Sequence, residues 1–362
     1  MSAITLSTLR TYAVARSLAG TDAITTLERA LERAAFVQAD PIRAPAVAQD
    51  LELRHRVKDY RAGDLEARYR ELPIEEDYFV NYGFVTPALQ ASMHPRTPRR
   101  TWTKTEQKRA AAVLDYVREK GTVHPREVDA HFAHGTVKNW WGGQSSASTQ
   151  LLDGMHYRGL LRVAGRKSGI RLYRAREPFT AQTDPRAAHD RLVDAIVARY
   201  APLPEPSLRQ LLAHLGLGAP QWRDAKKAAF DRAKSRLACA TVEGHRWYWP
   251  AGEDPAAFDA PAFRVWWLSP FDPVVWDRRR FELLWGWAYR FEAYTPAKKR
   301  VRGYYALPML VADDVVGWAN VSVDDGVMDV ELGYAKKRKR DKSLSNAIDE
   351  ERARMAAFLR AK

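Results

Sequence analysis

Residues 160–174, LLRVAGRKSGIRLYR, contain two strand-like runs joined by a turn with a glycine at each end. The runs are residues 160–164 and 170–174. The turn between them, GRKSG at 165–169, holds the residue type that most readily adopts the positive φ angles of hairpin turns. The stretch therefore predicts a β-hairpin.

Three helical segments precede this hairpin. The first covers residues 105–120, the second opens at Pro125 after a short strand, and the third covers about 145–158. Proline suits the first position of a helix because its missing N–H would have no helical partner there. Three helices followed by a hairpin are the order of a winged-helix module.

The same order of elements returns further along the chain with a different sequence. Three helical segments are followed by two strand-like runs around Glu243-Gly244-His245; the segments are 190–200, 207–215 and 221–237, and the runs are 239–242 and 246–249. This repeat predicts a further winged helix. Residues 1–90 are compatible with another copy, although their sequence shows no traceable wing hairpin.

The pattern changes from about residue 262. Four strand-like runs follow, separated by acidic turns, and a last helix is expected over 344–359; the runs are 265–268, 304–310, 315–321 and 327–332. We therefore expect an α+β chain of tandem winged-helix modules followed by a β-barrel-like domain. The expected ranges are a winged-helix-like module at 1–100, a second winged helix with a basic wing at 101–180, a third at 181–255, and the β-barrel-like domain with its terminal helix at 256–362.

The charge of the chain indicates a polyanionic partner. Lys and Arg number 58 against 44 Asp and Glu, which gives a net charge of +14. Cations placed on phosphates release condensed counterions, so such an excess favours nucleic-acid binding. The alternative is a solubility charge, but the basic residues are clustered, which favours the first interpretation.

Three clusters are the expected contacts with DNA. Residues 158–176 hold seven basic and no acidic residues, and like charges facing each other across strands cost free energy that a phosphate backbone would offset. The alternative for this hairpin is protection of a solvated edge. A proline-containing linker at 94–104 and a basic stretch among tyrosines at 298–302 are the other two clusters. The expected DNA-binding residues are Arg96, Arg99, Arg100, Arg166, Lys167, Arg171, Lys298, Lys299, Arg300 and Arg302.

The sequence lacks the motifs of several classes of enzyme and metal site. It contains neither a P-loop nor an HExxH motif, and its single cysteine, Cys239, excludes an internal disulfide and a four-cysteine metal site. We expect no metal and no cofactor. The sequence has no signal-peptide pattern and no run of 18 apolar residues. A cytoplasmic, nucleoid-associated bacterial protein that acts as a monomer is expected.

The candidate catalytic residues are Gln38 and Asp40. In an extended segment, residues two apart point the same way, so both side chains can face one cavity. The carboxylate can accept a proton from water and stabilise positive charge, while the amide holds the water. The alternative is structural: Asp40 followed by Pro41 is also the pattern of a helix N-cap with proline at the first helical position, and spacing alone favours it.

Three stretches resemble the crosslink-repair DNA glycosylases of the YcaQ/AlkZ type, also described as a winged-helix DNA-binding family. They are the Gln38-Ala39-Asp40 triplet, which resembles the family's Gln-x-Asp motif, and the stretches SPFDPVVWDRRR at 269–280 and RGYYALPML at 302–310. The central Ala39 differs from the larger aliphatic residue that is common there. The resemblance spans nearly the whole chain.

This resemblance implies tandem winged helices and a β-barrel around a DNA-binding surface, with Gln38 and Asp40 as the catalytic pair. It implies a monofunctional hydrolase that excises purines alkylated at N7 or N3, and in some members unhooks interstrand crosslinks. The expected partner is double-stranded DNA with alkylated or crosslinked bases. The alternative is a winged-helix transcriptional regulator or other DNA-binding protein without catalysis. Exposure of the pair in a cleft favours the enzyme, and an N-cap role for Asp40 favours the binder.

Overall fold

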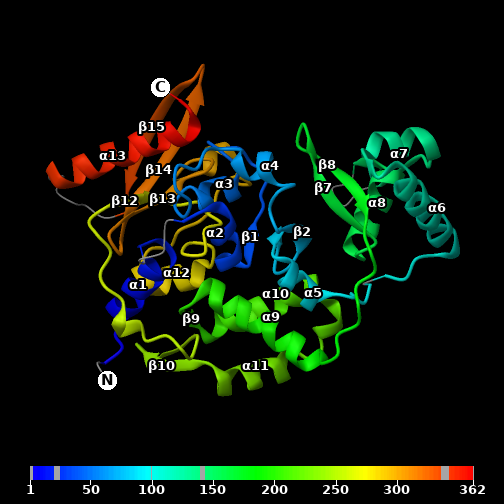
Figure 1. Ribbon diagram of the computed structural model, residues 1–362. Coiled ribbons are helices and arrows are strands. Elements are labelled where there is room, and N and C mark those ends of the chain that lie inside the picture. Colours follow the sequence, from blue (N-terminus) through cyan, green and yellow to red (C-terminus); the bar gives the residue numbers. More distant parts are fainter. Residues whose placement is uncertain (1–2, 20–24, 99, 139–142, 336–341, 362) are drawn as a thin grey trace. The chain divides into compact units, whose positions relative to one another are not determined.

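The computed structural model describes residues 3–19, 25–98, 100–138, 143–335 and 342–361 (Figure 1). The chain divides into two compact units: unit 1 comprises Met1–Leu65, Val193–Leu211 and Phe230–Lys362, and unit 2 comprises Glu66–Leu192 and Leu212–Ala229. Helices alternate with several small antiparallel sheets, which makes the fold mixed α+β. The four expected domain ranges stay predictions.

The central part of unit 2 has the element order that the sequence predicted. The elements are α6 (Lys104–Lys120), β4 (Thr122–Val123), α7 (Pro125–Phe132), β5 (Thr136–Lys138), β6 (Gln144–Ser146), α8 (Ala147–Tyr157), β7 (Leu161–Lys167) and β8 (Ile170–Ala175). The last two strands and β4 form an antiparallel sheet in the order β4–β8–β7. Helices α6, α7 and α8 lie against this sheet (Figure 1).

The predicted hairpin is confirmed, with a turn shorter than expected. Lys167 pairs with Ile170, so only Ser168 and Gly169 form the loop, with φ angles of 51° and 76°. Positive φ at both central positions is the geometry that matches the twist of the flanking strands. Gly165 belongs to the strand and marks a shift in register, with φ at 141°.

The predicted repeat follows the same order. Its elements are α9 (Pro185–Tyr200), β9 (Leu203–Pro204), α10 (Glu205–Gly218), a short 3₁₀ turn (Pro220–Trp222), α11 (Lys226–Arg236), β10 (Ala238–Val242) and β11 (His245–Trp249). The sheet order is β10–β11–β9, so the final strand again lies between its hairpin partner and the short strand that precedes the second helix. Architecture is repeated here without repetition of sequence.

The N-terminal segment has the same succession of elements along the chain. They are α1 (Leu6–Val14), a π-helical turn (Ala15–Ala19), α2 (Leu27–Ala34), β1 (Phe36–Gln38), α3 (Ala48–Leu53), α4 (Asp64–Arg68), β2 (Glu75–Tyr78), β3 (Tyr82–Val85) and α5 (Pro87–Met93). The antiparallel β2–β3 hairpin occupies the place of the wing. It was hidden in the sequence because its first strand begins with three acidic residues, which are poor strand formers.

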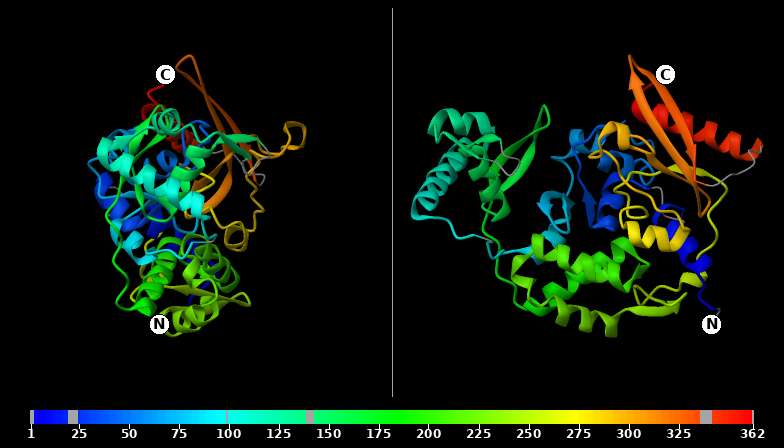
Figure 2. Two further views of the ribbon diagram at one scale, coloured as in Figure 1. Left: turned by 90° about the vertical axis from the view of Figure 1, so that its right-hand side faces the viewer. Right: turned by 180° about the vertical axis from the view of Figure 1, so that it is seen from behind.

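The C-terminal part of unit 1 is an open sheet. Its strands are β12 (Val265–Trp267), β13 (Leu307–Val311), β14 (Asp314–Asp324) and β15 (Val327–Tyr334), antiparallel in this order, with β12 and β15 as unpaired edges. The described residues form no closed barrel, so the domain that the sequence predicts as β-barrel-like is an open four-stranded sheet. Helix α13 (Lys342–Leu359) packs against β12 and runs beside the sheet, as Figure 1 and the right-hand view of Figure 2 show. A shorter helix, α12 (Arg278–Trp285), precedes β13.

Large aromatic side chains dominate the core of unit 1. Trp247, Trp267, Trp285 and Phe281 are at most 2% exposed. Each such ring removes a large apolar area from water, so these residues hold strands and helices from distant parts of the chain together. None of the described helices is both long and apolar enough to span a membrane.

Candidate active site and nucleic-acid interface

The Gln38–Asp40 segment follows an abrupt end of helix α2. Ala35 terminates the helix in the left-handed region, with φ at 54°, a conformation that costs a non-glycine residue about 1 kcal/mol. The three residues of β1 that follow are all buried, and the Gln38 side chain is only 8% exposed. The strand is therefore held on both faces, which fixes the backbone that leads into Asp40.

Asp40 is a half-buried carboxylate that pairs with no cation of the described residues. Its Oδ1 atom accepts a hydrogen bond of 3.0 Å from the backbone N–H of Ile42, and its own N–H donates to Oε1 of Gln49 at 3.3 Å. Burial raises the pKa of Asp40, and the Ile42 hydrogen bond opposes the rise. No Lys or Arg in the described ranges forms an ion pair with it, although charge in a partly buried place is ordinarily neutralised by such a partner.

The structural alternative for Asp40 is wrong. No helix begins at Pro41; residues 41–47 are irregular, and α3 starts only at Ala48 with Val47 as its N-cap. The hydrogen bond to Ile42 is a local turn of the aspartate on the backbone two residues ahead. Asp40 therefore caps no helix, and its position needs another explanation.

Two further hydroxyl groups belong to this environment. Tyr305 is 4% exposed and Ser269 is fully buried. Burial raises the pKa of Tyr305, the Ser269 hydroxyl opposes the rise, and the Asp40 carboxylate adds to it, which ties the phenol electrostatically to Asp40. The phenolic oxygen is buried beside the Ser269 hydroxyl, and no atom of the described residues forms a well-aligned hydrogen bond with it. The high pKa keeps the phenol protonated, so Tyr305 is a hydrogen-bond donor with an unused bond.

Sequence reasoning did not identify Gln49, Ser269 or Tyr305 as site residues. Ser269 and Tyr305 lie in the two late stretches that carry the family resemblance. The resemblance therefore pointed to these stretches, but it assigned no role to either residue. Gln49 had no signal, because an amide on a short helix is ordinary. Within the described residues, no group of three or more His, Cys, Asp and Glu side chains could hold a metal ion.

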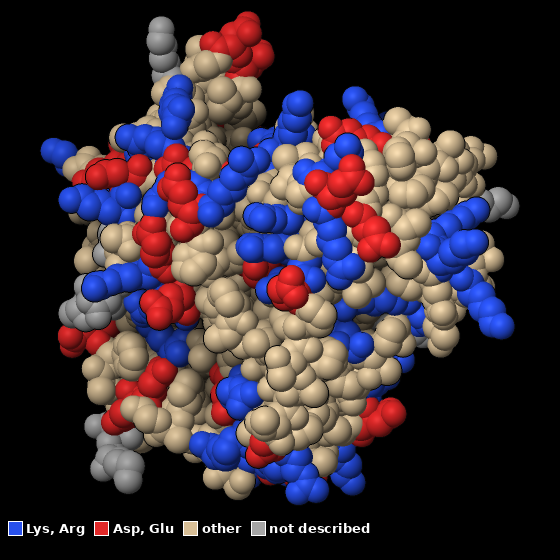
Figure 3. All heavy atoms as spheres, turned by 45° about the vertical axis from the view of Figure 1, so that its right-hand side comes forward, with Lys and Arg blue, Asp and Glu red and all other residues tan. Residues whose placement is uncertain are grey.

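The basic hairpin β7–β8 is largely neutralised within unit 2. Glu75 pairs with Arg162 at 2.9 Å and with Arg176 at 3.2 Å, and Glu76 pairs with Arg166 at 2.5 Å. Arg171 lies 3.7 Å from Glu76, 3.0 Å from Asp153 and over the ring of Tyr82. The charge of this hairpin therefore needs no phosphate to offset it, since strand β2 supplies most of the offset. Figure 3 shows the same mixing of acidic and basic side chains on the visible face.

Two basic residues of the hairpin remain exposed without an ion pair among the described residues: Lys167 at its tip and Arg174 on β8. Arg174 lines an open groove of about 740 Å³. The other groove residues are Ala91, Arg162 and Ala175–Thr183. These positions are the part of unit 2 that is best suited to contact a polyanion.

The three basic residues that the sequence assigns to the linker at 94–104 lie in different surroundings. Arg96 is 6% exposed; it pairs with Asp77 at 2.6 Å and donates to the carbonyl groups of Tyr78, Tyr157 and Gly218. The prediction that Arg96 contacts phosphate is wrong because its guanidinium is buried and committed to these acceptors. Arg100 is exposed and forms a bidentate pair with Glu106 at 2.6 and 2.9 Å. Arg99 lies outside the described residues.

The 298–302 stretch belongs to an exposed loop that contains a 3₁₀ turn (Ala297–Lys299). Lys298 and Lys299 are exposed. Arg300 donates to the carbonyl group of Thr295 and lies over Tyr304, while Arg302 donates to the carbonyl group of Ala288 and lies over Trp287. The loop ends directly before Tyr305.

This loop has an apolar tip and a fixed base. Tyr294 and Val301 are 81% and 76% exposed. The buried Glu292 accepts hydrogen bonds from the backbone N–H groups of Val301 and Arg302, at 3.0 and 2.7 Å. A loop held in this way presents its lysines and exposed apolar groups in a defined conformation.

Comparisons with known proteins identify the family and the fold of the chain. The profile of the family described as "DNA glycosylase AlkZ-like" matches residues 31–358. The structure is similar to that of Streptomyces sahachiroi DNA glycosylase AlkZ, with a TM-score of 0.61 over 99% of this chain and 97% of that chain, at 13% sequence identity. The structural likeness at this identity concerns the fold, whereas the family match spans most of the sequence. The chain belongs to the AlkZ-like DNA glycosylase family.

Proposed function

We propose that this protein is a monofunctional DNA glycosylase that hydrolyses the N-glycosidic bond of purines alkylated at N7 or N3, with crosslinked purines as a further substrate class. The observation that carries the proposal is Asp40: a half-buried carboxylate that caps no helix and, within the part of the chain that the structure describes, pairs with no cation. Membership of the AlkZ-like DNA glycosylase family supports DNA as the substrate of this protein. We further propose that the winged-helix interpretation of the repeated modules accounts for duplex binding, and that the protein acts as a monomer.

The chemistry of the lesion makes a lone carboxylate sufficient. An N7- or N3-alkylated purine carries positive charge and leaves readily, so the bond breaks toward an oxocarbenium-like sugar. A carboxylate stabilises that cation, as in glycosidases, and accepts a proton from the attacking water. No lysine nucleophile is then needed, and the product is an abasic site in an uncut strand.

Gln38 and Tyr305 are proposed to orient the water and the substrate. The amide of Gln38 can hold water by hydrogen bonds, and the protonated phenol of Tyr305 can donate one to a reacting oxygen atom. Buried polar atoms are normally satisfied, so the unused bond of Tyr305 is consistent with a partner that arrives with the substrate. The loop with Lys298 and Lys299 immediately precedes Tyr305 and is the proposed DNA contact in unit 1.

The decisive test is excision of N7-methylguanine from a labelled duplex. Hot alkali converts abasic sites into strand breaks, so product is expected only after alkali treatment and only from the alkylated duplex. Strand cleavage without alkali would contradict a monofunctional mechanism. Tight, salt-sensitive binding with no product from N7- or N3-alkylated duplexes would favour the alternative, a DNA-binding protein without catalysis.

The raised pKa of Asp40 predicts the acid limb of the pH profile. The carboxylate is the active form, so single-turnover excision is expected to slow as pH falls and Asp40 becomes protonated. Because burial raises the pKa of Asp40 above its usual 3.8, the midpoint of this limb is expected above pH 3.8. Single-turnover rates between pH 4 and 9 measure it, with spontaneous depurination subtracted. A rate that does not change with pH in this range would contradict a role for Asp40 as base.

Two adjacent residues of the basic hairpin are expected to respond differently to the same substitution. Lys167→Gln removes an exposed cation that forms no ion pair with the described residues, so the slope of log K against log salt for duplex binding should fall by about 0.9. Arg166→Gln removes the partner of buried Glu76, so it should lower the unfolding midpoint in urea and leave the salt slope nearly unchanged. Equal changes in slope for both variants would contradict the internal pairing of the hairpin.

A further inference from the structure

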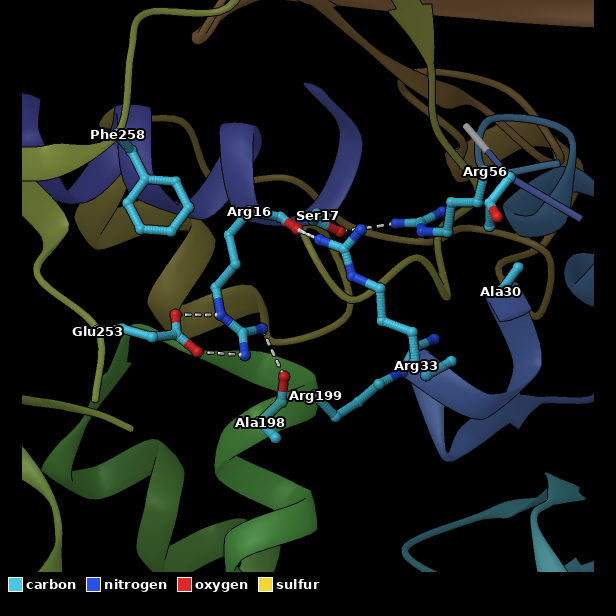
Figure 4. A pocket seen from close by; sticks show the side chains of 11 residues that line it. Arg16, Ser17, Ala30, Arg33, Arg56, Ala198, Arg199, Glu253 and Phe258 are labelled. Atoms are coloured by element: carbon cyan, nitrogen blue, oxygen red, sulfur yellow. Dashed lines mark hydrogen bonds and ion pairs between the residues drawn. The ribbon is translucent and has the colours of Figure 1, made fainter. Parts of the chain in front are cut away.

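A cavity of about 250 Å³ in unit 1 lies outside the proposed site (Figure 4). Its lining includes neither Gln38 nor Asp40, and Arg16 forms an ion pair of 2.6 Å with Glu253 there. The surroundings of Asp40 are of another kind, because they include aromatic rings. These rings belong to an aromatic cluster of unit 1 that consists of Phe271, Phe291, Tyr294 and Tyr305.

The aromatic cluster extends outward from the neighbourhood of Asp40. Tyr305, which is 4% exposed and interacts electrostatically with Asp40, lies 5.1 Å from Phe291 in an edge-to-face contact. Phe291 in turn lies 5.3 Å from Phe271 and 6.0 Å from Tyr294, measured between ring centroids. Phe271 and Phe291 are half-buried, whereas Tyr294 is 81% exposed. Exposure to solvent thus increases from the ring near Asp40 to the far end of the cluster.

Hydrogen bonds hold the backbone beside both phenylalanines. The hydroxyl group of Ser269, which also interacts with Tyr305, accepts a hydrogen bond of 3.1 Å from the N–H of Phe271. Glu292, the residue after Phe291, accepts hydrogen bonds of 3.0 and 2.7 Å from two backbone N–H groups of the loop that follows. The two rings are therefore carried on ordered backbone, so a ligand that contacts them does not have to order these segments first.

The Phe271 ring has a face that no aromatic or cationic side chain of the described residues covers. A ring has two faces, and Phe271 has one aromatic neighbour in this part of the chain, Phe291. Arginine covers another ring of the same region, since the guanidinium of Arg300 lies 4.9 Å from the ring centroid of Tyr304. Within the described ranges, no Lys or Arg lies over Phe271 or Phe291 in this way. A cationic ligand therefore meets no competing cation at the Phe271 ring.

The lesion of the proposed function is such a cation. A purine alkylated at N7 or N3 carries positive charge, and the negative face of an aromatic ring attracts a cation within about 6 Å of its centroid. This attraction is stronger where water is excluded, as it is at a half-buried ring. A neutral purine also stacks on aromatic side chains, but it gains nothing from this electrostatic contribution. An aromatic contact beside Asp40 would therefore favour a cationic purine over a neutral purine of the same shape.

We propose that Phe271, supported by Phe291, contacts the face of the alkylated purine and selects cationic lesions over neutral ones. This inference rests on the proposed function, and it adds a residue that determines specificity without taking part in bond cleavage. Asp40 favours the same cationic purine through its negative charge. The contribution of Phe271 is therefore measured as a difference between variants that all retain Asp40.

Equilibrium binding of the full chain to two lesions that resist hydrolysis tests the proposal. One duplex carries N7-methylguanine on a 2′-fluorinated sugar, because the fluorine disfavours a cationic sugar and so prevents excision. The other carries 7-methyl-7-deazaguanine, which has the same shape without the charge. The native chain is expected to bind the cationic lesion about tenfold more tightly than the neutral one. Phe271→Leu keeps an apolar side chain without a ring, so it should reduce this preference at least about threefold.

Three further variants separate the ring contact from folding and from general binding. Phe271→Tyr retains a ring and should keep the native preference. Phe263→Leu makes the same change at a position that is 51% exposed and outside the aromatic cluster, and it should also keep the preference. A trifluorinated phenylalanine at position 271 retains the shape of the ring but weakens its negative face. This variant should lose the preference as Phe271→Leu does, and it provides the measurement even where the leucine variant is unstable.

The inference and the proposed function fail in different measurements. An unchanged preference with the trifluorinated ring, an equal loss in Phe263→Leu, or no preference in the native chain would overturn the contact with Phe271. None of these results affects the proposed function if N7-methylguanine is still excised from an ordinary duplex. A preference that depends on the ring at position 271, in a protein that excises no alkylated purine, would support the contact and contradict the glycosylase.

Discussion

Asp40→Asn is expected to lower the single-turnover rate of N7-methylguanine excision by about 10²–10⁴-fold. The amide has nearly the shape of the carboxylate but neither accepts the water proton nor stabilises a cationic sugar by charge. Because no cation pairs with Asp40 among the described residues, the change removes no ion pair. The acceptor for the Ile42 N–H is retained through the amide oxygen atom. The rate is measured with labelled duplex and hot alkali.

The controls for Asp40→Asn separate chemistry from binding and folding. Duplex affinity and thermal stability should remain close to those of the native chain, because the change breaks no ion pair with the described residues and keeps the shape of the side chain. Asp349→Asn makes the same chemical change at an exposed position of α13 and should excise at the native rate. Excision at the native rate by Asp40→Asn would remove Asp40 from the mechanism and leave the family resemblance without its catalytic residue in this chain.

The largest loss of stability is expected from Asp77→Ala in unit 2. Asp77 is 2% exposed and accepts hydrogen bonds from Arg96 at 2.6 Å and Gln90 at 2.7 Å, and its Oδ2 atom lies 3.0 Å from Nε2 of His94. Its removal leaves the Arg96 guanidinium buried without a counter-charge. Breaking a buried pair from one side typically costs about 3–5 kcal/mol. Urea denaturation measures the loss, and Asp115→Ala, at an exposed ion pair on α6, should leave the midpoint nearly unchanged.

The same network predicts how stability depends on pH. Burial by itself would raise the pKa of Asp77, but Arg96 and His94 outweigh it and hold the pKa well below its usual range. A depressed pKa in the folded state contributes stability above the ordinary aspartate pKa of about 3.9, and this contribution is lost as pH falls through the folded value. The native chain should therefore lose stability more steeply below pH 4 than Asp77→Ala does. Parallel profiles would contradict the role of the network.

The repeated modules could be predicted because their signals are local. Pro125 opens a helix and Gly169 closes a tight turn, and each acts through its own backbone geometry. The β2–β3 hairpin escaped prediction because Glu75 and Glu76 are strand residues whose charges are satisfied by arginines about 90 positions away. Pairing with a distant arginine outweighs the low strand propensity of glutamate, and the residues near Glu75 and Glu76 in the sequence give no sign of that partner.

The candidate site shows the same limit. The Gln38–Asp40 pair was found through its spacing and resemblance, yet spacing alone favoured a helix cap that the structure does not contain. Arg96 was assigned to phosphate because its neighbours are basic and include prolines, whereas its acceptors come from residues as distant as Gly218. Tyr305 becomes a candidate site residue only through its electrostatic interaction with Asp40, which lies some 265 positions earlier in the chain. Long-range contacts decide each of these roles.

The pairing of the basic hairpin with strand β2 also bears on how a repair enzyme would search a genome. Each Lys or Arg side chain that contacts a DNA phosphate releases counterions from the duplex. These ions must bind again when the protein dissociates, so each such contact lengthens the time that the protein stays on undamaged DNA. Because Glu75 and Glu76 pair with four of its arginines, the hairpin would bind undamaged DNA less tightly than its composition suggests. Shorter stays let the protein slide and hop past more base pairs in the same time. The ion pairs within the hairpin would thus shorten the time that the protein spends at any one site and increase the length of DNA that it inspects.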